Sequence, residues 1–131
     1  MKTISELTAL CKEINPILAH EKYYFVSTHE IIENVCASFK EQEGTTYILK
    51  EENIPSGSTF KTSGPFALVT LSVYSDLTAV GFLATITKAL AQEHISANVI
   101  SAYYHDYLFI PWNERQHAMG ILITLQKSYN T

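Results

Sequence analysis

Cysteine is scarce in this chain, which argues against a disulfide-rich secreted protein. The 131 residues include two cysteines, Cys11 and Cys36, whose separation matches no metal-binding motif and builds no disulfide framework. We interpret both as buried thiols in a reducing compartment, because unpaired cysteine behaves in protein interiors as a small apolar residue. A cytoplasmic location is therefore expected.

Concentrated charge and long apolar runs are also missing. The formal net charge is −4 and the nine Lys and Arg residues form no cluster, whereas a nucleic-acid-binding face needs gathered positive charge. No apolar run approaches the roughly 20 residues of a membrane-spanning helix. The chain starts with an acidic, amphipathic segment, so we expect no secretory signal peptide. Neither nucleic acid nor a membrane is expected as a partner.

The chain lacks the residue patterns of catalytic sites. No nucleophile–base pair, paired carboxylates or phosphate-binding loop stands at a useful spacing, and the five histidines show no ligand spacing. His105 and Asp106 are adjacent, but adjacent residues of a strand point to opposite faces and do not converge on one ion. We interpret Asp106 as a hairpin-turn residue bonded to local backbone. No enzyme activity, cofactor or metal site is expected.

What the chain does contain is a long patterned stretch, Leu68 to Pro111. Apolar residues alternate along residues 67–74, which predicts a strand with one strongly buried side. The polar turn 75–78 places Asp76 or Thr78 as a capping residue ahead of an apolar run that starts at Val80, so a helix follows. Two further strands, 97–104 and 107–110, are joined by a sharp reversal at His105-Asp106.

The remaining elements follow from shorter signals. A capping box at Thr3 and Glu6 opens a helix that Asn15-Pro16 ends, and Asn113 with Gln116 opens a closing helix. Further strands are predicted at 23–28, 35–40 and 45–49, with the last two forming a hairpin, and one helical turn is predicted at 51–53.

Pro, Ser and Gly gather at residues 55–58 and 62–65, the only linker-like composition in the sequence. We therefore expect two halves, residues 1–62 and 63–131, that pack together on a shared core. The second half reads strand-helix-strand-strand-helix, a ferredoxin-like order without its last strand. The first half lacks its opening strand. We therefore expect strands of the first half to complete the sheet of the second half.

Four blocks of residues carry a resemblance to a known family. They are Glu41-Gln42-Glu43-Gly44-Thr45, Ser75-Asp76-Leu77-Thr78-Ala79-Val80-Gly81, Ile95-Ser96-Ala97-Asn98-Val99 and His105-Asp106-Tyr107-Leu108-Phe109-Ile110-Pro111. In this order they resemble a family of small bacterial proteins with two tandem ACT-like domains, which is similar to the regulatory ACT domains of aspartokinase and to the eukaryotic cytosolic arginine sensors. The resemblance implies an α+β, ferredoxin-like ACT fold.

The same resemblance implies reversible binding of a small metabolite, most often an amino acid, at an interface between two domains. It places the ligand against the turn after the first strand and against the neighbouring strand. The implied site residues are Ser75, Asp76, Val80, Gly81, Asn98, Val99 and Ile100, with Asp106 joining them when the ligand carries a distal cationic group.

Two of these residues have an alternative explanation. A glycine in the first turn of a helix costs about 1 kcal/mol relative to alanine, so Gly81 indicates either close approach of a ligand to the backbone or close helix–strand packing. Asn98 offers both a donor and an acceptor to a ligand, but a polar residue at this place is more often a plain strand-edge or turn-facing residue.

The sequence therefore supports two functions from different classes. The first is a non-catalytic regulatory protein that senses an amino acid. The second is a structural or interaction protein whose ACT-like sheet mediates oligomerisation without a ligand. In both cases we expect a homodimer, because open sheet edges are commonly paired across a two-fold axis.

Overall fold

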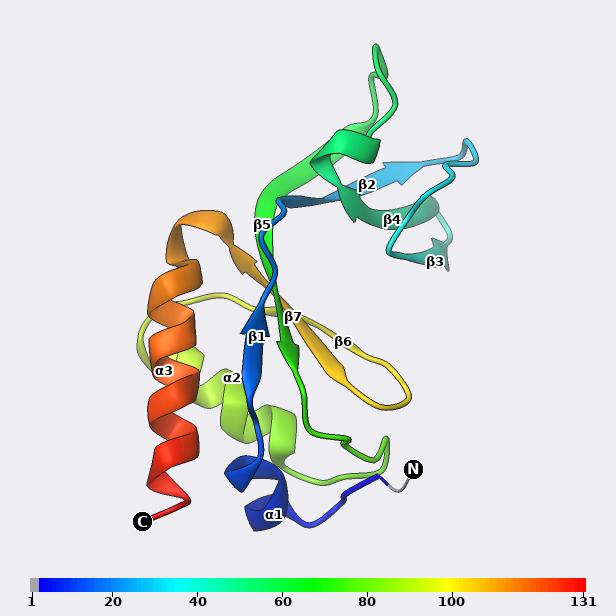
Figure 1. The fold of residues 1–131 in the computed structure, drawn as a ribbon. Coiled ribbons are helices and arrows are strands. Elements are labelled where there is room, and N and C mark those ends of the chain that lie inside the picture. Colours follow the sequence, from blue (N-terminus) through cyan, green and yellow to red (C-terminus); the bar gives the residue numbers. More distant parts are fainter. Residues whose placement is uncertain (1–2) are drawn as a thin grey trace.

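One long strand, β5 (Lys61–Leu71), joins the two halves of the molecule into a single seven-stranded sheet (Figure 1). The structure is a computed structural model that describes residues 3–131. The first residues of β5 pair with β2 (Tyr23–Thr28), and the last residues pair with β1 (Pro16–Leu18) and β7 (Asp106–Pro111). The other strands are β3 (Ala37–Glu41), β4 (Gly44–Lys50) and β6 (Asn98–Ser101). The α+β fold class is confirmed.

The C-terminal half obtains its missing strand from the N-terminal end of the chain. β1 pairs antiparallel with β5, so the strands lie in the order β1-β5-β7-β6. Three helices, α1 (Leu7–Lys12), α2 (Phe82–Gln92) and α3 (Arg115–Ser128), pack on one face of this sheet (Figure 1). Their shared core includes Leu10, Cys11 and Ile14, all fully buried. The segment with α1 and β1, residues 7–18, is therefore part of the second half.

The N-terminal half repeats the same strand arrangement, with a loop and a 3-10 turn in place of α-helices. Its order is β5-β2-β4-β3, with β5 in the place that β1 has in the other half. Residues 29–36 and the short 3-10 turn η1 (Glu51–Asn53) stand where a ferredoxin-like unit has its helices. Ile32 from the first of these loops is buried against Val26 and Leu49, so a loop covers the apolar sheet face.

Several predicted boundaries are wrong because long-range pairing overrides local composition. Residues 62–65 are not a linker: Thr62 and Ser63 pair with Val26 and Phe25, which satisfies their backbone groups within β5. The expected boundary at 62/63 therefore falls inside this strand. β1 was not predicted at all, since Asn15-Pro16 indicates only a helix end.

The predicted helix starts also differ from the structure. Glu6 itself caps α1, and its carboxylate accepts hydrogen bonds from the N–H groups of Thr8 and Ala9, so Thr3 is not the cap. These two bonds, the Ala9 bond foremost, lower the pKa of Glu6. Asn113 lies in the 3-10 turn η2 (Trp112–Glu114) instead of capping α3.

The thiols differ in burial. Cys11 is buried as expected, but Cys36 is exposed, because it precedes the edge strand β3. Within residues 3–131 no helix has the length and apolarity to cross a bilayer. In the same range no three His, Cys, Asp or Glu side chains gather as a metal site requires.

Candidate functional site

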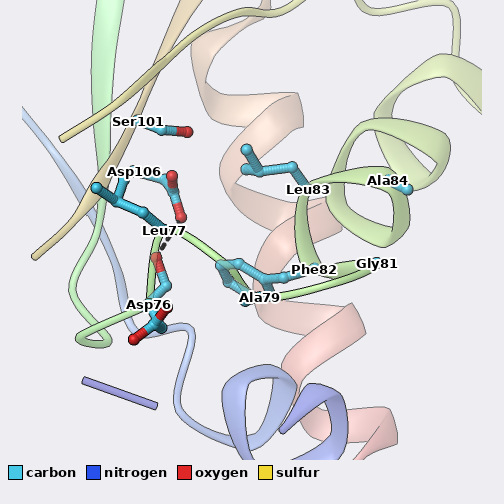
Figure 2. Close-up of a pocket in the computed structure, with 10 residues that line it drawn as sticks. Asp76, Leu77, Ala79, Gly81, Phe82, Leu83, Ala84, Ser101 and Asp106 are labelled. Carbon is cyan, nitrogen blue, oxygen red and sulfur yellow. Dashed lines mark hydrogen bonds between the residues drawn. The ribbon is translucent and has the colours of Figure 1, made fainter. Parts of the chain in front are cut away.

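A pocket opens where β5 ends and the chain turns toward α2 (Figure 2). Its volume is about 120 Å³. Figure 2 shows Ser101 and Asp106 on one side of the pocket and the first residues of α2 on the other. The lining residues are Ser75, Asp76, Leu77, Ala79, Gly81, Phe82, Leu83, Ala84, Ser101 and Asp106.

The turn that forms the pocket is held by the first residues of the chain. The N–H of Ile4 donates to the carbonyl of Tyr74 at 2.6 Å, and the N–H of Asp76 donates back to the carbonyl of Ile4 at 2.8 Å. On the other side, the N–H of Ser75 donates to the carbonyl of Tyr104 at 3.0 Å. Backbone bonds on both sides therefore fix the position of Ser75, which is 4% exposed.

Asp76 organises the turn and does not cap α2. Its Oδ1 accepts hydrogen bonds from the N–H and the hydroxyl of Thr78, and its Oδ2 accepts one from the hydroxyl of Thr3 at 2.8 Å. The Thr78 hydroxyl, followed by the Thr78 N–H and the Thr3 hydroxyl, lowers the pKa of Asp76. Because both carboxylate oxygens already accept hydrogen bonds within the protein, Asp76 fixes the shape of the turn that lines the pocket.

Gly81 precedes α2 instead of lying inside it. Its φ of +90° belongs to the left-handed region that side chains other than glycine rarely adopt. A Cβ at this position would meet only Leu7 Cδ2, at 3.7 Å, so close packing does not explain the glycine. Backbone conformation alone accounts for it.

This start leaves the N-terminus of α2 without a side-chain cap. Within residues 3–131, the N–H groups of Phe82, Leu83 and Ala84 donate no hydrogen bond, and the first bond of the helix runs from Thr85 to the carbonyl of Gly81. All three residues with free N–H groups line the pocket. The pocket therefore has a wall with positive electrostatic character, since the helix dipole adds to the free donors.

Asp106 supplies the opposite wall. It is 4% exposed, and its Oδ2 accepts a hydrogen bond of 2.6 Å from the hydroxyl of Ser75. Within the described residues no Lys, Arg or His forms an ion pair with it. Asp106 belongs to β7 and pairs in register with Ser101, which brings both side chains to the pocket. The interpretation of Asp106 as a turn residue bonded to local backbone is wrong, because the turn lies at residues 102–105.

The structure brings together four of the eight site residues named from the sequence: Ser75, Asp76, Gly81 and Asp106. The others do not line it. Val80 stands between two lining residues but is itself 84% exposed. Asn98 is exposed at the far end of β6, Val99 packs in the helix-side core, and Ile100 lies on the other face of the sheet. Ser101 was not predicted from the sequence. The hairpin register could have identified it, because this register pairs Ser101 with Asp106.

Comparison with known families and structures agrees with this fold. Models described as "ACT domain" match residues 2–54 and residues 65–124. A protein of unknown function from Vibrio cholerae, described as a possible transport protein, is 35% identical, with a TM-score of 0.76 over 86% of this chain and 89% of that chain. Among curated proteins, none matches.

More distant structures share the fold alone. The regulatory subunit of aspartate kinase from Thermus flavus is 9% identical, with a TM-score of 0.62 over 84% of this chain and 95% of that chain. Aspartate kinase from Clostridium acetobutylicum is 9% identical, with a TM-score of 0.63 over 85% of this chain and 34% of that chain. The sequence resemblance to tandem ACT proteins is thereby confirmed, and the chain belongs to the ACT-domain family, with two ACT domains in tandem.

Proposed function

We propose that this protein is a non-catalytic regulatory ACT protein that binds an amino acid in the pocket between the β5–α2 turn and the β6–β7 hairpin. One observation carries the proposal: among residues 3–131, the pocket has free helix N–H groups on one wall and, on the other, a buried carboxylate that forms no ion pair. An α-amino acid carries a carboxylate and an ammonium group one carbon apart, so it matches both walls at once.

The wall formed by α2 fits the ligand carboxylate. Backbone N–H groups at a helix N-terminus are ready donors to an anion, and the helix dipole favours negative charge there. Phe82, Leu83 and Ala84 provide these donors, and Gly81 has no side chain that could compete for them.

The wall formed by Asp106 fits the ligand ammonium. A buried carboxylate is costly unless it is paired and hydrogen-bonded, and the Ser75 hydroxyl provides one neutral partner. A cationic group in the pocket would supply the missing charge. The ammonium group of an amino acid does so without requiring a basic side chain.

The size of the pocket fits the head group of such a ligand. A cavity of roughly 150 Å³ holds benzene, and this pocket has about 120 Å³. The ligand side chain therefore extends toward the opening, past Leu77 and Leu83. Leu77 is 62% exposed and the nearby Val80 is 84% exposed, and these exposed apolar side chains support a second copy of the chain as the partner at this opening. We include a homodimer and a cytoplasmic location in the proposal, the latter because both cysteines are free thiols.

The test is a thermal-denaturation screen against the twenty proteinogenic amino acids. A ligand at 100 times its dissociation constant stabilises the folded state by roughly 2.7 kcal/mol, which raises the melting temperature by several degrees. The N-acetyl derivative and the methyl ester of the stabilising amino acid are matched controls, because each removes one of the two charges. Both are expected to lose the effect.

Two results would contradict the proposal. If no amino acid stabilises the protein, the assembly function without a ligand is the remaining hypothesis. If the N-acetyl derivative binds as well as the free amino acid, Asp106 does not pair with an ammonium group.

A further inference from the structure

A second pocket lies between the two halves, on the sheet face opposite the helices. Its volume is about 320 Å³, and it is lined by Cys36, Ala37, Ile100, Ala102, Tyr107 and Phe109. We propose that this pocket binds an uncharged compound built around an aromatic ring. It is separate from the amino-acid pocket, although residues of both pockets alternate along β6 and β7.

The curl of the sheet creates this pocket. β3 and β6 are the two end strands in the order β3-β4-β2-β5-β7-β6, yet Ala37 of β3 and Ile100 of β6 line the same pocket. Figure 1 shows β3 and the turn after β6 on the same side of the molecule. Two edges of one sheet therefore face each other across an opening that no strand fills.

Small residues keep the opening free. The cluster beneath it is made of large side chains, with the rings of Tyr23 and Phe25 packed edge-on against Phe109 at 5.8 and 5.4 Å. Phe109 is 1% exposed and forms a fixed aromatic floor. Ala37 and Ala102 also line the pocket, and larger side chains at these positions would occupy part of the space.

The lining determines the chemistry of the ligand. All six lining residues are uncharged, so an ion would lose its hydration without gaining a charged partner. The polar side-chain groups are the hydroxyl of Tyr107 and the thiol of Cys36. Although Cys36 is an exposed residue, partial burial of its thiol raises the thiol pKa, so the group stays neutral near pH 7. The volume is at the lower end of the roughly 300–1,000 Å³ of small-molecule sites, and a ring compound presents its edge or face to Tyr107 and Phe109.

The experiment titrates the full chain with three uncharged ring compounds, indole, 4-methylphenol and toluene, and measures binding by nuclear magnetic resonance. We expect saturable 1:1 binding of at least one of them, and at least tenfold weaker binding of its carboxylate-bearing analogue. Ala37→Phe fills the pocket and should weaken binding at least tenfold. Ser38→Phe is the matched control, because the neighbouring strand residue points to the other face and should leave binding unchanged.

Alkylation of Cys36 gives a second measurement, which uses the unmodified protein and therefore does not depend on whether a variant folds. Cys11 is fully buried, so iodoacetamide reacts with Cys36, and a saturating ring compound should slow this reaction at least tenfold. Asp106→Asn should leave ring-compound binding unchanged, which separates this site from the amino-acid pocket. Absence of saturable binding by all three compounds, or unchanged affinity in a folded Ala37→Phe protein, overturns the proposal. Unchanged alkylation at saturation overturns it as well.

Discussion

The hydroxyl of Ser75 donates a hydrogen bond of 2.6 Å to Oδ2 of Asp106, and both residues are 4% exposed. This bond joins the segment after β5 to the first residue of β7, and it holds the Asp106 carboxylate at the wall of the pocket. Because the serine hydroxyl is neutral, the bond positions the carboxylate without neutralising it. The pair therefore defines where a cationic group of a ligand would bind.

Replacement of Asp106 by asparagine tests this role. Asp106→Asn keeps the size and one acceptor oxygen but removes the charge, so the protein should remain folded. A hydrogen bond to a charged group contributes about 1.5–3 kcal/mol, so affinity for the amino acid found by the screen should fall about 10- to 100-fold. Titration calorimetry measures this, with Glu43→Gln in the exposed β3–β4 turn as the matched charge removal. Equal affinity of Asp106→Asn and the unmodified protein would place the ligand elsewhere.

Two glycine substitutions should change stability in opposite directions. Gly81→Ala forces a side chain into a φ of +90° and should lower the free energy of unfolding by about 1–2 kcal/mol. Gly120→Ala, in the middle of α3 with no atom within 4 Å of the added Cβ, should raise it by about 0.5–1 kcal/mol. Urea denaturation of both variants provides the comparison. If Gly81→Ala leaves the free energy of unfolding unchanged, the turn relaxes to another conformation.

The turn that shapes the proposed amino-acid pocket should contribute stability that depends on pH. Hydrogen bonds from Thr78 and Thr3 lower the pKa of Asp76 below its usual value of 3.8 in the folded state. A group with a lowered folded-state pKa stabilises the fold above its unfolded pKa and loses this contribution as the pH falls through the folded pKa. The stability difference between the unmodified protein and Asp76→Asn should therefore be largest near pH 6 and shrink below about pH 4. Denaturant titrations between pH 3 and pH 7 check this, and a difference that is constant with pH would contradict it.

The C-terminal half should not fold without the first residues of the chain. A fragment of residues 66–131 lacks α1 and β1, so it exposes the core that Leu10, Cys11 and Ile14 cover and leaves β5 with an open edge. We expect an aggregating fragment without a cooperative thermal transition by circular dichroism. A permuted chain, residues 61–131 followed by a flexible linker and residues 3–20, restores these elements and should melt cooperatively. A soluble 66–131 fragment with a sharp transition would show two independent units.

Self-association should depend on the exposed apolar residues at the pocket opening. Val80 is 84% exposed, so Val80→Glu should leave the fold intact while placing a charge in the proposed interface. Sedimentation velocity at tens of micromolar is expected to show a dimer for the unmodified protein and a monomer for the variant. Lys40→Glu, on the exposed edge strand β3, is a control for added acidic charge. A monomer in the unmodified protein would contradict the dimer.

Local patterns in the sequence were sufficient for most of the elements, with β1 as the exception. Alternation along residues 67–74 predicted a strand with one buried side, and β5 has Val69 and Leu71 buried, although it ends at Leu71. The apolar run after Val80 predicted a helix, and α2 follows from Phe82. The β3–β4 hairpin was also predicted correctly. These features depend on the period of a strand or helix, which a few neighbouring residues express.

Tertiary structure decided how distant segments complete one another. The short strand β1 has no strand-like pattern, and its pairing with β5 depends on residues more than 50 positions away. The four candidate site residues that line the pocket come from the β5–α2 turn and from β7, whereas Asn98 and Ile100, only a few positions before Ser101, face other surroundings. The sequence by itself determined most of the elements and the ACT family, because these depend on local patterns and on blocks of residues. Only the tertiary structure decided which carboxylate is buried beside which helix end, because that depends on where residues 31 positions apart, such as Ser75 and Asp106, meet in space.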